Sequence, residues 1–113
     1  MKIINKDEFL KLPEGTLYCE YEPCFLSSPL IKGENCGHDD YYESEITDID
    51  FDSTGDMFDK YEEMEKEGKS YPLELHCYGR NAMFNDKQLF IIYEKTDVES
   101  LINKLTECLE VSK

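Results

Sequence analysis

The sequence predicts an α+β domain: a mostly antiparallel sheet of about five strands with two longer helices and one short N-terminal helix. Residues 16–22 alternate apolar and polar side chains, as a half-buried strand does, and residues 89–93 are apolar throughout. Apolar side chains recur at helical spacing over 55–67 and 98–109. Because the connections are short and the chain has 113 residues, we expect a single domain spanning residues 1–113.

The first half of the chain reads as a short helix followed by extended segments. Asn5 stands three residues before Glu8, which is the spacing of a helix N-cap and its box partner. Extended segments over 26–31 and 41–51 flank a predicted loop over 33–40. The alternation over 16–22 turns one set of side chains towards the expected core: Leu17, Cys19 and Tyr21.

A helix is predicted over 55–67. Asp52, Ser53 or Thr54 supplies its N-cap, and Gly68 is a natural stop because glycine adopts the left-handed conformation at low cost. The helix has one apolar stripe: Met57, Phe58, Tyr61 and Met64.

The C-terminal part predicts two strands and a last helix. Residues 73–78 alternate, and 89–93 is the expected central strand. Thr96, with Glu99 at the box position, is the expected cap of the helix. The expected buried face of this helix consists of Val98, Leu101, Ile102, Leu105, Cys108 and Leu109.

Negative charge is concentrated in one quarter of the chain. The net charge of −14 comes from 26 acids and 12 bases, which disfavours nucleic acid and anionic membranes as partners and favours a basic protein. Residues 39–67 contain thirteen acids, opposed only by Lys60 and Lys66, and therefore account for −11. Solubility alone does not require such a local concentration.

Several of these acids recur at structural periods. On an extended segment Asp48, Asp50 and Asp52 would project from one face about 6–7 Å apart. Such rows resemble the phosphate rows of a nucleic acid. The alternative is an ordinary solvated surface, because the helix also contains favourable i,i+4 pairs between acids and lysines.

We therefore predict a partner-binding surface made of these acids and two adjacent tyrosines, since tyrosine is favoured at the centres of interfaces. Its predicted residues are Asp39, Asp40, Tyr41, Tyr42, Glu43, Glu45, Asp48, Asp50, Asp52, Asp56, Asp59, Glu62 and Glu63.

The cysteines and histidines leave two interpretations open. Five cysteines are an odd number at irregular spacings, which is a poor disulfide framework. One interpretation is a set of reduced, mostly buried thiols, with Cys108 in the core. The other is a structural zinc site, which needs four ligands. Its candidate ligands are Cys19, Cys24, Cys36 and His38, with His76 or Cys77 as alternatives.

The sequence does not predict an enzyme. Two histidines and one arginine offer few acid–base pairs, and no phosphate-binding glycine loop is present. The opening segment contains acids and no apolar run of signal-peptide length, and no stretch is long enough to span a bilayer. We therefore expect a cytoplasmic protein without membrane contact; its oligomeric state is open.

In its small size, strong acidity and opening MKIINKDEFLKLPEGTLYCEYEP, the chain resembles small phage and prophage proteins of low-GC Gram-positive bacteria. Among these are the type II-A anti-CRISPR proteins, inhibitors of an RNA-guided nuclease. The resemblance implies a bacterial host cytoplasm and an inhibitor that blocks DNA binding or loading on a basic nuclease surface. Immunity proteins and antitoxins that neutralise nuclease toxins share this style and are the alternative, together with a zinc-stabilised interaction module.

Overall fold

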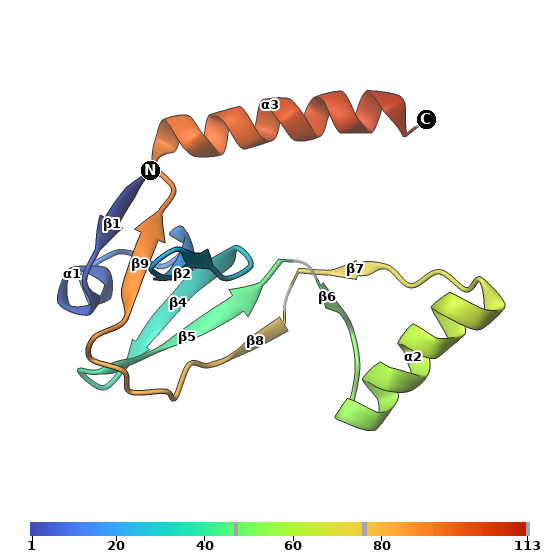
Figure 1. Cartoon of the computed structure of the whole chain (residues 1–113), viewed down its shortest axis with the longest axis horizontal. Coiled ribbons are helices and arrows are strands. Elements are labelled where there is room, and N and C mark those ends of the chain that lie inside the picture. Colours follow the sequence, from blue (N-terminus) through green and yellow to red (C-terminus); the bar gives the residue numbers. More distant parts are fainter. Residues whose placement is uncertain (47, 76, 113) are drawn as a thin grey trace.

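In the described part of the chain a seven-stranded sheet supports one short helix, and two longer helices extend away from it (Figure 1). The computed structural model describes residues 1–46, 48–75 and 77–112, without the side chains of Asp48 and Cys77. The elements are β1 (Lys2–Ile4), α1 (Lys6–Leu10), β2 (Leu17–Glu22), β3 (Phe25–Leu26), β4 (Leu30–Cys36), β5 (Asp40–Glu45), β6 (Asp48–Ile49), α2 (Thr54–Glu67), β7 (Leu73–Glu74), β8 (Cys77–Arg80), β9 (Leu89–Ile92) and α3 (Lys95–Val111).

The main sheet has the order β1-β9-β2-β4-β5-β8, with β3 paired to β2, and every pairing is antiparallel. The predicted α+β class with an antiparallel sheet is therefore confirmed. The strand count exceeds about five, partly because β1 pairs with β9 through Lys2 and Ile92. The 89–93 segment was correctly predicted to be interior, since β9 pairs on both sides.

The predicted loop over 33–40 is too long: only residues 37–39 of it form a turn. β4 continues to Cys36 and β5 begins at Asp40, so the two strands form a tight hairpin. The register shifts between Lys32 and Asn35, and a Cβ atom at Gly33 would lie 2.9 Å from Cβ of Tyr42. Because glycine has no side chain, Gly33 permits a close approach of the two strands. Glycine is more often found in loops, which is why the sequence predicted a loop here.

The core lies between α1 and one face of the sheet. The N-cap prediction is confirmed, because the Glu8 N–H donates to Asn5 Oδ1 at 2.9 Å. The cap directs Phe9 onto the sheet, where its ring stacks on Phe90 with a centroid separation of 3.9 Å. Seven residues form the buried cluster: Ile4, Phe9, Tyr18, Leu30, Tyr41, Phe90 and Ile92.

From β2, the side chain of Tyr18 enters this core. The predicted set of Leu17, Cys19 and Tyr21 is on the opposite face of the strand, so this prediction is wrong. Tyr18 is fully buried against Phe9. Cys19 is also buried, but on the opposite face of the sheet, where its Sγ lies 3.2 Å from the Tyr93 hydroxyl. Period-two alternation identifies two faces and leaves open which one a helix covers.

Residues 48–74 form a separate projection, which we call the acidic protrusion. In it α2 lies beside the two-stranded β6–β7 ladder, away from the main sheet (Figure 1). The predicted cap and stop are confirmed, because the Asp56 N–H donates to Ser53 Oγ at 3.1 Å and Gly68 has φ of 69°. The predicted strands 41–51 and 73–78 are each interrupted, and the expected apolar stripe of α2 is mostly exposed, at 63% for Phe58.

The C-terminal helix α3 extends from the end of β9, and no other element of the described chain packs along it (Figure 1). Its cap is Glu94 with Asp97 as the box partner, so the predicted cap at Thr96 is wrong. The predicted buried face is also wrong: Leu105 is 64% exposed, and Cys108 is exposed as well. Among the described residues, none of the helices combines the length and the apolar character needed to cross a membrane.

Replacing Phe9 by alanine should destabilise the protein by about 3–5 kcal/mol, because the ring fills the centre of the core between α1 and the sheet. Urea denaturation of the purified protein measures this free energy. Phe58→Ala, at a side chain that is 63% exposed, is the matched control and should change stability by no more than about 0.5 kcal/mol. Equal effects of the two substitutions would contradict the described core.

Candidate functional site

The acidic segment predicted from the sequence divides into two structurally different groups. Residues 39–45 belong to the main sheet around β5, whereas residues 48–74 form the acidic protrusion. The protrusion contains ten acids and three lysines and therefore has a net charge of −7. The two groups have different chemistry, because one is largely buried and the other largely exposed.

Asp40 was predicted to contact a partner, but its side chain is only 2% exposed. It accepts hydrogen bonds from Arg80 Nε and from the Ala82 N–H, both at 2.9 Å. Burial alone would raise the pKa of this carboxyl, yet the backbone N–H groups and the Arg80 guanidinium outweigh burial and lower it. Asp40 therefore anchors the loop after β8 to the sheet and is not part of an exposed acidic surface.

The predicted aromatic anchors are also occupied within the fold. Tyr41 is 1% exposed and meets Phe9 edge-on, so it cannot anchor a partner. Tyr42 is half-buried on the opposite face of the sheet, where it stacks on Tyr78 with a centroid separation of 4.9 Å. Tyr78 is 56% exposed, so the edge of this stacked pair is the aromatic surface that the sheet presents.

Glu43 is a half-buried carboxylate on the core side of β5, not an exposed one. The Tyr18 hydroxyl donates to its Oε2 at 3.0 Å, and Asn81 Nδ2 lies between this carboxylate at 3.5 Å and that of Glu20 at 3.1 Å. Burial is the main cause that raises the pKa of both glutamates, and the Glu43 charge further raises that of Glu20.

A small cavity of about 180 Å³ lies beside this pair. Sequence reasoning missed it, because its wall is made by the irregular segment after β8, in which Ala82 and Phe84 adopt positive φ angles of 55° and 50°. Neither alternation nor helical spacing marks such a segment. The lining residues are Lys6, Glu20, Glu22, Tyr41, Asn81, Met83, Asn85, Gln88 and Phe90.

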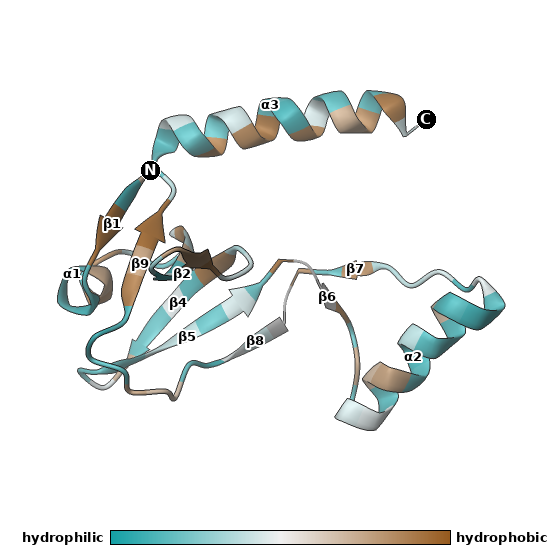
Figure 2. Ribbon diagram, in the orientation of Figure 1, coloured by the Kyte–Doolittle hydropathy of each residue, from teal (hydrophilic) through white to brown (hydrophobic). Residues whose placement is uncertain are grey.

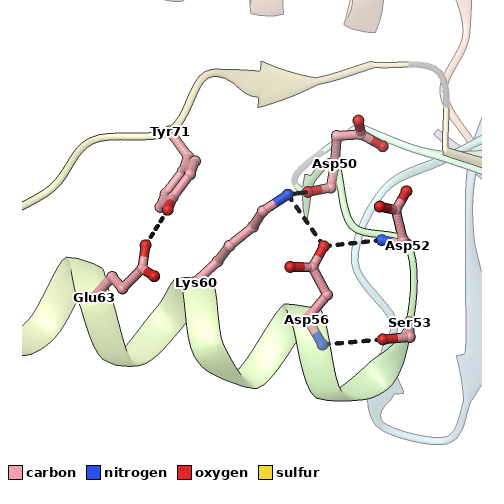
Figure 3. A network of polar contacts seen from close by, with 7 residues as sticks. All are labelled: Asp50, Asp52, Ser53, Asp56, Lys60, Glu63 and Tyr71. Carbon is pink, nitrogen blue, oxygen red and sulfur yellow. Dashed lines mark hydrogen bonds and ion pairs between the residues drawn. The ribbon is translucent and has the colours of Figure 1, made fainter.

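The acidic protrusion is held together by its own polar network (Figure 3). Lys60 Nζ donates to the Asp50 carbonyl oxygen at 2.6 Å and pairs with the Asp56 carboxylate at 3.2 Å. Asp56 also accepts from the Asp52 N–H at 3.0 Å, and the backbone hydrogen bond and Lys60 lower its pKa. The segment before α2 is thereby tied to the helix.

A second contact closes the other end of the protrusion. The Tyr71 hydroxyl donates to the Glu63 carboxylate, which raises the pKa of Tyr71 to about 12 and lowers that of Glu63 (Figure 3). Lys60 Nζ also lies 5.5 Å from the centre of the Tyr71 ring. Asp56 and Glu63 therefore have structural roles and are only half-exposed.

Among the described side chains of the protrusion, six other acids are exposed to solvent. The carboxylates of Asp50 and Asp52 point away from the Lys60–Asp56 network (Figure 3). Glu62 is exposed and pairs with Lys66 at 2.9 Å. The exposed acids here are Asp50, Asp52, Asp59, Glu62, Glu65 and Glu67, and Asp59, Glu62 and Glu67 line a shallow hollow on α2 together with Glu63 and Lys66.

Two other predicted members of the surface lie at the sheet, and one is outside the description. Glu45, at the end of β5, is exposed, and Asp39 is half-buried. The side chain of Asp48 lies outside the described residues. The surface that the structure brings together is therefore the protrusion and Glu45, without Asp40, Tyr41 or Glu43.

The candidate zinc ligands do not converge in the described part of the chain, where no three His, Cys, Asp or Glu side chains form a group suited to a metal ion. Cys19 is buried, Cys36 is half-buried, and Cys24 and His38 are exposed. The alternative ligands His76 and Cys77 fall outside the described residues and side chains. The zinc hypothesis stays a prediction.

Comparison of the chain with protein-family models, with curated proteins and with solved structures gives no match. The geometry and charge of the chain itself are therefore the basis for its proposed function.

Asp40→Ala should destabilise the fold by about 1–3 kcal/mol, because the Ala82 N–H and Arg80 lose a buried acceptor. Thermal unfolding followed by circular dichroism measures the effect. Asp39→Ala removes the same functional group from the neighbouring residue and is the control; it should leave the melting temperature nearly unchanged. A control that melts as early as Asp40→Ala would contradict the anchoring role.

The stability of the Glu43→Gln variant should increase relative to that of the natural chain as the pH rises from 5 to 8. The folded state raises the pKa of Glu43 above its ordinary value of 4.5, so it holds the proton more tightly than the unfolded chain. This contribution to stability is complete below the unfolded pKa and is lost as the pH rises through the folded pKa. Melting temperatures of both proteins at each pH test this, and a difference between them that stays constant with pH would contradict the prediction.

Proposed function

We propose that the protein is an inhibitor that binds a basic, nucleic-acid-binding surface of a nuclease through its acidic protrusion and blocks nucleic-acid binding. The observation that supports this most directly is the net charge of −7 on a protrusion that stands away from the sheet and exposes six of its carboxylates to solvent. The activity is stoichiometric binding, not catalysis.

Preorganisation supports this proposal. Like charges crowded on a flexible segment would spread apart, but the bonds from Lys60 and Tyr71 hold the protrusion in one arrangement before a partner arrives. A preorganised surface loses less conformational entropy on binding. Carboxylates on successive turns of α2 recur about every 5.4 Å along the axis, so they offer a basic groove a row of negative charge comparable to a phosphate backbone.

Electrostatics also predicts the kinetics. A surface of one sign attracts an oppositely charged groove over distance and raises the association rate, and this effect weakens as salt screens the charges. Among nucleases, the resemblance described above makes an RNA-guided nuclease of the type II-A CRISPR systems the first partner to test. A bacterial nuclease toxin is the second, because the same surface would suit an immunity protein.

Neutralising four exposed acids of the protrusion should weaken nuclease binding at least 100-fold. The variant Asp50→Asn/Asp52→Asn/Asp59→Asn/Glu65→Gln avoids Asp56 and Glu63, so the internal network remains. Biolayer interferometry with the immobilised nuclease, without nucleic acid, at roughly 50, 150 and 500 mM salt measures affinity and association rate. For the natural chain the association rate should fall steeply across this range, which brackets the change from weak to strong screening.

The control carries the same change in net charge elsewhere: Glu14→Gln/Asp86→Asn/Glu99→Gln/Glu110→Gln. These four side chains are exposed and lie outside the protrusion, so binding should stay within about threefold of the natural chain, since distant exposed charges are largely screened. An equal loss in both variants would show that overall charge matters and the protrusion does not. Full binding by the protrusion variant would refute the proposed surface.

A further inference from the structure

The apolar face of α3 is uncovered along its length. In this 17-residue helix, about 25 Å long, hydrophobic residues recur at helical spacing, and they colour one edge of the ribbon brown (Figure 2). A helix of this length is marginal in water by itself, and amphipathic helices in proteins are stabilised chiefly by packing of the apolar face. The exposed fractions on this face are 41% for Leu101, 57% for Ile102, 64% for Leu105 and 70% for Leu109.

Only the first turn of α3 is attached to the rest of the described chain. The N-terminal amino group pairs with Asp97 at 2.8 Å. Val98 lines a groove of about 500 Å³, whose other walls include Leu17 and Ile31. The apolar face of the helix therefore continues onto the uncovered side of the sheet, and together they form one apolar surface.

The chain exposes more surface area than a compact monomer of its mass. It exposes 8207 Å², whereas a compact monomer of 13.3 kDa is expected to expose about 6,450 Å². The excess of about 1,750 Å² is shared between α3 and the acidic protrusion, and half of it would match the roughly 800 Å² that each partner contributes to a standard stable interface. The radius of gyration of 16.2 Å, against about 13 Å for a compact chain of this length, reflects the same two projections.

The charges around this face favour a second copy of the chain over a basic partner. Lys95 and Lys104 stand among four acids on α3, so the helix contributes only −2 of the net −14. Charges of both signs beside an apolar face allow self-association, whereas a basic partner would be drawn to the protrusion. In a twofold dimer each apolar face also occurs twice, so the area buried by one helix is doubled.

We propose that two copies of this chain associate through α3, with the apolar face of each helix packed against the same face of its partner and extending over the groove at Val98. The dimer would present two acidic protrusions. Two protrusions on one particle would raise the apparent affinity for a partner with two basic sites. The dimer does not depend on the proposed inhibitor function.

Sedimentation equilibrium of the full chain from about 1 to 100 μM tests the proposal. The natural chain should sediment at twice 13.3 kDa in the upper part of this range, and Leu105→Glu should raise the dimer dissociation constant at least 100-fold. Asn103→Glu adds the same charge on the polar side of α3 and is the control, which should dimerise like the natural chain. A natural chain that is monomeric at 100 μM, or dimers that persist in Leu105→Glu, would overturn the proposal.

Two further measurements show whether a loss of dimer in Leu105→Glu is merely a loss of folding. Far-UV circular dichroism of Leu105→Glu shows whether the sheet and helices remain; if they do not, the milder Leu101→Asn/Leu109→Asn variant takes its place with the same expected loss of dimer. The melting temperature of the unmodified chain should rise with protein concentration, because association stabilises only the folded state. A melting temperature that is independent of concentration would contradict the dimer without any substitution.

Discussion

The stacking of Phe9 on Phe90 is the contact on which the rest of the molecule depends. It joins α1 to the interior strand β9, and the edges of Tyr18 and Tyr41 meet the same ring at centroid distances of 4.7 and 4.9 Å. Aromatic pairs of this kind contribute about 0.5–1.5 kcal/mol each beyond the area they bury. Through them one side chain holds together β9, β2 and β5, and so fixes the frame from which the protrusion and α3 extend.

Whether a carboxylate is buried near this small core or exposed depends on whether a hydrogen-bond donor lies within reach of it. The carboxylates of Asp40 and Glu43 can be buried or half-buried because donors reach them. Arg80 donates to Asp40. Tyr18 and Asn81 donate to Glu43. The acids of the protrusion have few such donors beyond Lys60 and Tyr71. Since burying an unpaired carboxylate is costly, the unpaired acids remain in solvent, and the result is a protrusion that is acidic on its exposed side.

The two long helices expose different kinds of side chain. On α2 the exposed surface contains acids beside the exposed Phe58 and Tyr61, and the acids suit a partner of opposite sign. On α3 the exposed side is aliphatic, which suits a partner that buries it away from water. A chain with both has one surface for electrostatic recognition and another for assembly, and the two can act independently because they extend from different points of the sheet (Figure 1).

The sequence by itself determined the local elements and the total charge. The caps at Asn5 and Ser53, the stop at Gly68 and the interior strand β9 follow from short-range rules that depend on neighbours along the chain. Only the tertiary structure decided which acids are buried, that Tyr18 and not Leu17 enters the core, and that the apolar face of α3 finds no cover in the described chain. Periodicity shows that two faces of an element differ, but which face is covered depends on elements distant in sequence.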